Sequence, residues 1–555
     1  MRKLKKSENQ NTESVELIIL EQIRKIKYIS DRQMLCVLLI FGFIFGGFAY
    51  GVHLDQDAEQ LILYSNVKGY LQHFRLEHTG LYADLDHAGV IGIEENIDKY
   101  NGMAIYYPMF FVFYLNQKSP YIGNIIWQAY IYLLCMGGLT ALFYLLRDIF
   151  PDRRVAVLGT LLYYFSPRMF AESHYNNKDM ILLSLTLGIL FFGRKLYQEV
   201  RWKWVILFAV IGSFATNAKI IGAFIWGMIG IYVLIMLIMD HRFHWETAVK
   251  MILCIGLWFA VYRIITPASA SGVIEFWKYL IDSAKNFWWN DYVLFRGQLY
   301  NKTTTGMSRA YLPTIILLTT PIGILGLTIL GGIDMVVKIV GNPREAAGTT
   351  GYIVTGIAAC LIPVIYAVWN RTPDYNGWRH FYFFYAAILL GAAQGISFLL
   401  QRGKKQKAVV FLMGGYCLLL AGSVLGNHPY EYAFYNCLAG KQVETNYELD
   451  YWNMAFKQAY ERILDRTEGK DISVGTISNP AYWGLEAQLY AIRGKQRMRI
   501  SLCENWNEAE YLIINPTYAY MYAASDYKWI KQEYKITDQI QSYGNVICEI
   551  YQKVQ

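Results

Sequence analysis

The chain has 555 residues, of which 55% are hydrophobic, 16% aromatic and 17% charged, and its formal net charge is +8. Soluble domains carry about 25% charged residues, and here the apolar residues gather in blocks long enough to cross a bilayer core of about 30 Å. The composition therefore excludes a soluble enzyme or binding module and predicts a multi-pass membrane protein. The positive charge does not indicate nucleic-acid binding, because basic residues also collect in the cytoplasmic loops of membrane proteins.

The N-terminal part is predicted to be cytoplasmic. Residues 1–33 are polar and basic with apolar residues at helical spacing, which predicts an amphipathic helix on the inner face of the membrane. The first apolar block, 34–52, is long enough to stay in the membrane as an anchor, so no cleavable signal peptide is expected. The positive-inside rule keeps the N-terminus in the cytoplasm and exports the polar segment 53–120.

Further apolar blocks follow, and with the first they make about eleven spans of membrane-crossing length. Most of the loops that this count assigns to the cytoplasm carry an excess of Lys and Arg, as the positive-inside rule requires. An odd number of spans places a second long segment, 268–310, and everything after residue 426 outside. The remaining predicted spans are 121–146, 153–168, 179–193, 203–217, 220–239, 249–267, 311–337, 351–369, 381–399 and 408–425.

The last part of the chain, 427–555, is polar and mixed in pattern. Its periodicity predicts helices over 452–466 and 480–494 and strands over 472–478, 511–516 and 545–552. We therefore expect three regions: the cytoplasmic segment 1–33, a membrane domain 34–426 and an exported α/β domain 427–555. The cysteines form no CxxC pair, so a zinc site is not expected, and a disulfide between Cys503 and Cys548 stays open.

Polar clusters outside the spans carry the candidate chemistry, and this topology puts all of them on the external side. Ionisable groups at membrane boundaries are costly unless they are paired, hydrated or functional. The densest cluster is the stretch 166–179, SPRMFAESHYNNKD. The others are the acids of 53–59 (HLDQDAE), Asn217 with Lys219, the group Asp374, Arg379 and His380, and His428 with Tyr430.

These residue types suit group transfer from a lipid-linked phosphate. A carboxylate can take the proton of an attacking hydroxyl, and the candidates are Asp55, Asp57 and Glu59. Fixed cations can stabilise a leaving phosphate, and the candidates are Arg168, Lys178, Lys219, Arg379 and His380. Imidazole and amide groups can orient donor or acceptor, and the candidates are His174, Asn176, Asn177 and His428.

Simpler interpretations stay open for each residue taken alone. Asp55 or Asp57 can be a solvated loop acid, and Arg168 can reach from a span end to the interface with no catalytic role. Lys219 and Arg379 can be ordinary interface anchors. The acids of 53–59 together with His53 can also bind a divalent cation, which we favour less.

Several motifs together resemble a known family. The stretch SPRMFAESHYNNKD resembles the SPRFFGHSFNNPKD-type loop of bacterial GT-C membrane glycosyltransferases, which are related to the dolichyl-phosphate-mannose protein mannosyltransferases. GVHLDQDAEQ is similar to the family's GISxDE segment, and YNGWRHFYF to its loop with an Arg-His pair. HPYEYAFYNCLAG and YELDYWNMAFKQA resemble its HPY and ELDYWG segments. These motifs run from about residue 51 to 457, over most of the chain.

The resemblance implies a GT-C fold and an inverting, metal-independent transferase with no cofactor. It implies a plasma-membrane enzyme that moves a sugar from a polyprenyl-phosphate carrier to an acceptor hydroxyl of a protein, glycan or lipid of the cell envelope. The family's catalytic acid falls on Asp55. Gln56 stands where the family has Glu, so Asp57 or Glu59 is a candidate partner acid. Ala171-Glu172 replaces a Gly-His pair, and no Pro precedes Lys178.

Two other functions remain open on the sequence. A transporter or flippase of lipid-linked sugars would use the same cations, but its charges would lie near the bilayer midplane, with broken helices and internal repeats. A non-catalytic membrane scaffold would display the C-terminal domain without needing Asp55. The position of the charges at the ends of the spans favours the enzyme. The sequence does not determine the sugar, the acceptor or the oligomeric state.

Overall fold

The computed structural model describes residues 29–270, 272–285, 292–301, 306–372, 376–402, 406–522 and 524–554. Most of the predicted cytoplasmic segment 1–33, and Asp374, lie outside the described residues. The chain forms two compact units, Met1–Phe45 and Gly46–Gln555. The described part of the first unit is the apolar helix α2 (Asp31–Gly46), which ends at the unit boundary. The three predicted domain boundaries stay predictions.

The second unit is built on long apolar helices, as the composition predicted. Eight of the described helices are long and apolar enough to cross a membrane, and α10 (Trp202–Ala218) is a shorter apolar helix beside them. The chain is therefore a multi-pass membrane protein. The eight are α6 (Pro120–Ile149), α9 (Asp179–Gln198), α11 (Ile221–Met239), α12 (Trp245–Ile265), α15 (Ile322–Gly341), α17 (Thr349–Asn370), the run Arg379–Gln401 that joins η3 (Arg379–Phe384) to α18 (Tyr385–Arg402), and α19 (Gln406–Asn427).

Two of the predicted spans are interrupted by proline. The block 153–168 forms α7 (Arg153–Tyr164), and a new helix, α8 (Pro167–Tyr175), starts after Ser166, whose extended backbone suits a residue before proline. The block 311–337 divides into α14 (Tyr311–Thr319) and α15 at Thr320-Pro321 for the same reason. The total of about eleven spans stays a prediction.

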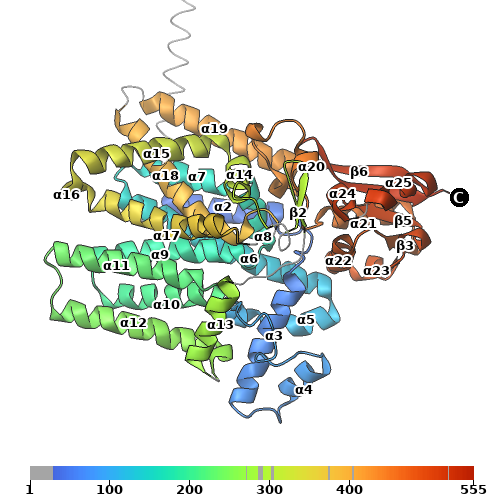
Figure 1. The fold of residues 1–555 in the computed structure, drawn as a ribbon, viewed down its shortest axis with the longest axis horizontal. Coiled ribbons are helices and arrows are strands. Elements are labelled where there is room, and N and C mark those ends of the chain that lie inside the picture. Colours follow the sequence, from blue (N-terminus) through green and yellow to red (C-terminus); the bar gives the residue numbers. More distant parts are fainter. Residues whose placement is uncertain are drawn as a thin grey trace, which may run out of the picture. The chain divides into compact units, whose positions relative to one another are not determined.

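Small residues set how closely the membrane helices approach. In Figure 1 the helices of this unit form a bundle in which α6 packs on α9, α10 lies against α9 and α12, and α15 packs along α18. At the last contact, a Cβ atom on Gly331 would lie 2.0 Å from the carbonyl oxygen of Gly391, and one on Gly395 would lie 2.1 Å from that of Leu327. These glycines allow backbone contact, which drives helix association where lipid removes the hydrophobic effect.

The segments predicted as external loops contain helices of their own. Residues 53–120 form α3 (Gln56–His73), α4 (Gly80–His87), η1 (Ala104–Met109) and α5 (Val112–Lys118). Residues 268–310 include the end of η2 (Pro267–Ser269), the helix α13 (Val273–Lys285), and a hairpin of β1 (Tyr292–Phe295) and β2 (Gln298–Asn301) that the sequence did not reveal. The helix α3 packs on η1 and η2 and brings its first turn to the polar cluster described below.

The C-terminal part has the predicted α/β fold. Five strands form one sheet in the order β4-β3-β5-β7-β6, parallel among the first three and antiparallel among the last three. Strands β3 and β5 and the hairpin strand β7 were predicted, whereas β4 and β6 were not, because β4 has only three residues and β6 is mostly polar. The strands are β3 (Ile472–Gly475), β4 (Ile500–Leu502), β5 (Tyr511–Ile514), β6 (Tyr534–Ser542) and β7 (Asn545–Lys553).

Helices and short turns complete the described elements. The helices around the sheet are α21 (Ala455–Arg466), α22 (Asn479–Gln488), α24 (Pro516–Tyr522) and α25 (Ala524–Glu533) (Figure 1). The short elements are α16 (Pro343–Ala346), η4 (Glu431–Ala433), η5 (Cys437–Ala439), α20 (Val443–Asn446), η6 (Leu489–Ala491), α23 (Gly494–Arg497) and η7 (Trp506–Glu508). The thiols of Cys503 and Cys548 are free, so these two residues form no disulfide.

Side chains of the C-terminal part form hydrogen bonds with the backbone of the segment that leads into α3. The buried amide of Gln488 accepts from the backbone N–H of Val52 and donates to its carbonyl oxygen, each at 2.8 Å. The ammonium group of Lys457 donates to the carbonyls of Phe48 and Ala49 at 2.8 and 2.9 Å. The segment before Asp55 is therefore fixed by side chains more than four hundred residues later in the chain.

The Gln488 clamp predicts a stability effect. Replacing Gln488 by Leu leaves the two polar groups of buried Val52 without partners, at a cost of about 2–5 kcal/mol in the free energy of unfolding. Thermal unfolding of the full chain in detergent measures the change. The matched control is Gln541→Leu on the exposed face of β6, for which we expect a change within about 0.5 kcal/mol. Equal stability of the two variants would show that the clamp is absent.

Candidate functional site

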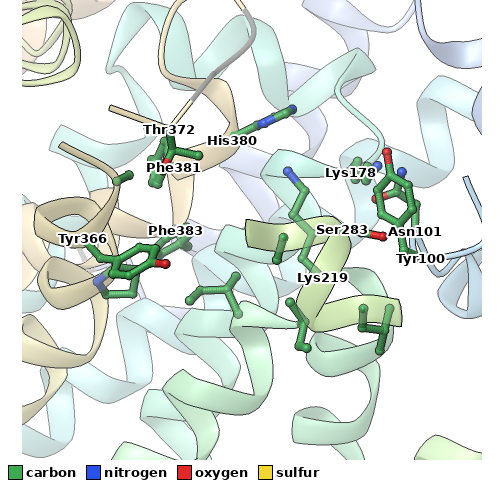
Figure 2. Close-up of a pocket in the computed structure, with 16 residues that line it drawn as sticks. Tyr100, Asn101, Lys178, Lys219, Ser283, Tyr366, Thr372, His380, Phe381 and Phe383 are labelled. Carbon is green, nitrogen blue, oxygen red and sulfur yellow. The ribbon is translucent and has the colours of Figure 1, made fainter. Parts of the chain in front are cut away.

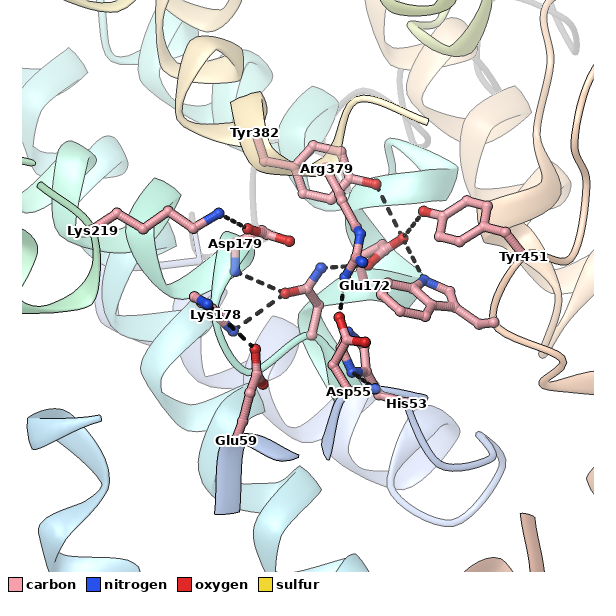
Figure 3. Close-up of polar contacts among 12 residues, drawn as sticks. His53, Asp55, Glu59, Glu172, Lys178, Asp179, Lys219, Arg379, Tyr382 and Tyr451 are labelled. Atoms are coloured by element: carbon pink, nitrogen blue, oxygen red, sulfur yellow. Dashed lines mark hydrogen bonds and ion pairs between the residues drawn. The ribbon is translucent and has the colours of Figure 1, made fainter. Parts of the chain in front are cut away.

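Five segments bring their polar residues together at one end of the membrane helices. They are the turn before α3, the α8–α9 connection, the end of α10, the start of η3, and the loop that precedes α21 (Figure 3). Ion pairs and hydrogen bonds join most of the residues drawn in Figure 3 into a network. The structure thus brings together five of the residues singled out in the sequence, namely Asp55, Glu59, Lys178, Lys219 and Arg379.

Asp55 and Arg379 form the ion pair nearest the centre of this cluster. The Oδ2 atom of Asp55 lies 2.6 Å from Nη1 of Arg379, and the Asp55 side chain is 39% exposed while that of Arg379 is 8% exposed. Burial of the Asp55 carboxyl would raise its pKa, but the positive charge of Arg379 more than offsets this and lowers the pKa to about 2. Asp55 is therefore an ionised carboxylate with one side open to a substrate.

An aromatic platform supports the guanidinium group. The ring of Trp452 lies 4.3 Å from the guanidinium carbon of Arg379, a distance typical of a cation–π contact. The same indole ring contacts the imidazole of His53, with 3.8 Å between ring centroids. Burial lowers the pKa of His53 to about 4, so this ring is neutral near pH 7.

Glu172 joins three segments through hydrogen bonds: its own helix α8, the helix η3 and the loop before α21. Its carboxylate, fully buried, accepts hydrogen bonds from the hydroxyls of Tyr382 and Tyr451 at 3.0 Å and from the indole N–H of Trp452 at 3.3 Å. It also accepts from the side-chain amide of Asn176 at 2.8 Å. Burial raises the pKa of Glu172, and its donors work in the opposite direction.

Asn176 shapes the turn that carries Lys178 and Asp179. Its side-chain oxygen accepts from the backbone N–H groups of Lys178 and Asp179 at 3.3 and 2.8 Å, and so caps the start of α9. The amide nitrogen is engaged by Glu172 at the same time. The Asn-Asn-Lys-Asp sequence therefore folds back at the membrane end of α9 and aims two charged side chains toward α3 and α10.

Two further ion pairs follow this turn. Lys178 lies 3.9 Å from Glu59 on the first turn of α3, and Lys219 lies 2.5 Å from Asp179. Burial raises the pKa of Glu59 and lowers that of Lys178, because each charged form is poorly hydrated there. The two groups share a proton more evenly than exposed groups would, and Glu59 is a weaker candidate than Asp55 for a fixed anion.

A mainly apolar cavity opens beside the lysines. It has a volume of about 290 Å³, and Lys178, Lys219 and His380 line one part of it (Figure 2). The other walls come from the end of α17, the start of α11 and the last turns of α13. They include Ile221, Leu280, Ala284, Pro363, Tyr366, Ala367 and Phe383. The cavity thus has a polar end, formed by two lysines and a histidine, and mainly apolar walls.

The remaining sequence candidates occupy other places. Asp57 is exposed on α3, where the charges near it belong to Glu486 and Arg497 of the C-terminal part. Arg168 is buried among tyrosines and donates to the carbonyl of Phe434 at 3.4 Å. Asn177 is 1% exposed, and its backbone carbonyl accepts from the hydroxyl of Tyr106.

The two other histidines belong to a neighbouring aromatic group. His174 stacks on Tyr132 with ring centroids 4.5 Å apart and also contacts Tyr50. His428 lies 2.6 Å from the buried carboxylate of Glu431, and its ring also packs against Tyr50. The role of these two histidines in orienting a substrate stays a prediction.

Several residues of the site were not assigned a role from the sequence. Glu172 and Asp179 lie inside the stretch that drew attention, and Tyr451 and Trp452 lie inside the matched ELDYW segment. The match to the ELDYW motif was the signal that could have drawn attention to Tyr451 and Trp452. The role of these two residues depends on the sheet domain folding back onto η3. Among the described residues, no group of three His, Cys, Asp or Glu side chains is placed to hold a metal ion.

A comparison with known protein families matches part of the chain. Residues 108–267 match the family model of the dolichyl-phosphate-mannose-protein mannosyltransferases, and this segment contains the α8–α9 connection and Lys219. Over this segment the match supports the class predicted from the motifs, a membrane glycosyltransferase of the GT-C class. None of the curated proteins compared matches the chain.

Two solved structures of ArnT from Cupriavidus metallidurans are similar to the chain. The apo structure has 11% identity and a TM-score of 0.46, over 95% of this chain and 99% of that one. The structure bound to undecaprenyl phosphate has 11% identity and a TM-score of 0.41, over 94% and 97%. Because both TM-scores are below 0.5, we infer the function from this chain's own residues and from the family match.

The Lys219–Asp179 pair predicts a stability effect that does not depend on function. Lys219→Met leaves Asp179 buried without its ammonium partner and lowers the free energy of unfolding by about 3–5 kcal/mol. The double variant Asp179→Asn with Lys219→Met removes the stranded charge and recovers most of the loss. Thermal unfolding in detergent measures both, and Lys495→Met, an exposed lysine, is the control. A double variant as unstable as the single one would contradict the pairing.

Proposed function

We propose that this protein transfers a sugar from a polyprenyl-phosphate carrier to an acceptor hydroxyl, with inversion at the anomeric carbon and with Asp55 as the general base. The observation that carries the proposal is the partly exposed, ionised Asp55 carboxylate. It interacts electrostatically with Lys178, which lines a mainly apolar cavity together with Lys219 and His380. The family match supports the carrier class, since those enzymes are named for a dolichyl-phosphate-linked donor.

The cavity fits an isoprenoid phosphate in charge and in polarity. Its apolar walls lie between helices that are long enough to span a membrane, so a lipid chain can enter from the bilayer. The two ammonium groups can stabilise the charge that grows on the phosphate as it leaves. Both lysines are held in ion pairs, which keeps them directed toward the cavity and reduces the entropy lost when a phosphate binds.

The reaction then follows from the positions of base and cations. The acceptor hydroxyl donates a hydrogen bond to the open oxygen of Asp55, and its oxygen attacks the anomeric carbon. The bond from that carbon to the phosphate oxygen breaks, and the bonding pair leaves with the carrier phosphate. Asp55 receives the hydroxyl proton late in this step, when the attacking oxygen has become acidic, because a carboxylate with a low pKa is a weak base.

For Arg379 we propose a role other than the phosphate contact expected from the sequence. In the structure it pairs with Asp55, so it orients the base and keeps it ionised. The proposed phosphate ligands are the other three candidate cations that line the cavity, Lys178, Lys219 and His380. We also propose that the site faces the outside of the cell and that the N-terminus is cytoplasmic, as the distribution of Lys and Arg between the loops favours. No metal or cofactor is proposed.

The decisive variant is Asp55→Asn. We expect the rate of sugar transfer to fall by about 10²–10⁴-fold because the amide cannot accept the proton. The assay follows release of free carrier phosphate from a radiolabelled polyprenyl-phosphate sugar by the purified protein in detergent. Thermal unfolding shows whether the variant stays folded.

Asp57→Asn is the matched control for the base. Its carboxylate is exposed and lies toward the C-terminal part, so we expect it to keep most of the wild-type rate. A normal rate for Asp55→Asn together with a loss for Asp57→Asn would assign the base to Asp57. A wild-type protein that moves the lipid-linked sugar across vesicles but releases no carrier phosphate would favour the transporter over the enzyme.

The cavity predicts an effect of donor chain length. Ala284→Trp places a large side chain at an exposed position that lines the cavity, so we expect the KM of a long-chain donor to rise by about fivefold or more, with a smaller effect on a short-chain donor. Ile281→Trp on the same helix, exposed and not part of the cavity wall, is the control. Equal KM changes for both variants and both donors would remove the cavity as the donor site.

A further inference from the structure

The segment Glu448–Trp452 connects the C-terminal α/β part to the candidate active site. It is folded by the carboxylate of Asp450, which is 1% exposed and accepts from the backbone N–H groups of Met454 and Ala455, each at 3.0 Å. The hydroxyl of Tyr432 donates to the same carboxylate at 2.6 Å. These bonds fix the backbone before α21, and so they fix the direction of the aromatic side chains at 451 and 452.

Both aromatic side chains leave their own domain and bind Glu172. The Tyr451 hydroxyl and the Trp452 indole N–H donate to the same carboxylate oxygen, Oε1, at 3.0 and 3.3 Å. The third donor to this oxygen is the hydroxyl of Tyr382, three residues after Arg379 (Figure 3). Glu172 therefore joins the C-terminal segment to the short helix η3, which carries Arg379.

A second contact holds the other side of the Arg379 turn. The carboxylate of Glu448 accepts from the side-chain amide of Asn376, three residues before Arg379. The turn is thus fixed before and after Arg379, and the indole of Trp452 lies under the guanidinium between these two points. Because Trp452 also contacts the ring of His53, which precedes Asp55 by two residues, it touches both sides of the ion pair.

We propose that Trp452 is a positioning residue of the transferase: its indole ring, fixed by Glu172, holds the Arg379 guanidinium in the geometry that orients the Asp55 carboxylate. This inference rests on the proposed function, since it assigns Asp55 as the base. The physical reason is that an arginine side chain has many rotamers, and an aromatic face beneath the guanidinium leaves few of them. Small errors in the placement of a catalytic group have large effects on rate.

The proposal makes the C-terminal α/β part a component of the active site. The Lys457 and Gln488 side chains of the same part hold the segment before Asp55, and the 448–452 segment holds the turn of Arg379. Both partners of the ion pair are therefore supported from one folded unit. A separate acceptor-binding module would not need these contacts.

The test uses the full-length protein in detergent and the variant Trp452→Met, which keeps a smaller apolar side chain at this position and removes the aromatic face. We expect kcat to fall by about 10–100-fold with the KM of the donor changed less than about threefold, because the donor cavity does not include Trp452. Trp452→Phe restores a ring under the guanidinium and is expected to recover most of the rate. The control is Trp506→Met, which changes a half-buried tryptophan that packs against the core of the C-terminal sheet.

A second readout does not depend on catalysis. Carbodiimide-driven coupling of an amine to Asp55, measured by peptide mass spectrometry, reports how well Arg379 covers the carboxylate. We expect labelling of Asp55 to be low in the wild type and about threefold or more higher in Trp452→Met, while Trp506→Met stays at the wild-type level. If Trp452→Met does not fold, Trp452→Leu, which also lacks an aromatic face, takes its place and must show the same changes.

The outcomes separate this inference from the proposed function. An active wild type in which the Trp452 variants match Trp506→Met in kcat and in labelling would overturn the positioning role and leave the transferase intact. A wild type that releases no carrier phosphate would overturn the proposed function, while the labelling data would still show whether Trp452 holds Arg379 against Asp55. A rise in KM alone, with kcat unchanged, would also contradict the inference.

Discussion

The ion pair between Asp55 and Arg379 is the interaction on which the site depends. It joins the turn before α3 to the start of η3, two segments 324 residues apart in the chain. Its geometry determines whether Asp55 is ionised, which way its free oxygen points and how close it lies to the cations of the cavity. A lone carboxylate at a membrane boundary would be costly, and the partner makes it stable without closing it to substrate.

Two further ion pairs lie close to this pair. Lys178 lies beside Glu59, and Lys219 beside Asp179, so two lysines can face an apolar cavity without the cost of isolated buried charge. The same arrangement leaves cationic groups at the head of a groove between membrane helices. This combination suits an amphiphilic donor better than a water-soluble nucleotide sugar, because an apolar chain needs the groove and a phosphate needs the lysines.

The C-terminal α/β part gives this arrangement its rigidity. Membrane helices place η3 and the α8–α9 connection at one end of the bundle, but contacts from Trp452, Tyr451 and Glu448 fix them relative to each other. Buried hydrogen-bonded networks of this kind stabilise one arrangement over its alternatives, provided every member has a partner. The membrane helices and the small sheet domain are therefore interdependent at the site, although they are distinct in their folds.

The sequence by itself determined the membrane class, most helix positions, the α/β character of the tail and the importance of 166–179, because hydropathy, proline and short motifs are local properties. It also singled out Asp55, Lys178, Lys219 and Arg379, since ionisable residues beside apolar blocks stand out. Only the tertiary structure decided that Arg379 pairs with Asp55, that Glu172 and Trp452 support this pair, and that Asp57 lies apart. These facts depend on contacts between residues hundreds of positions apart, for which a single sequence holds no pairing information.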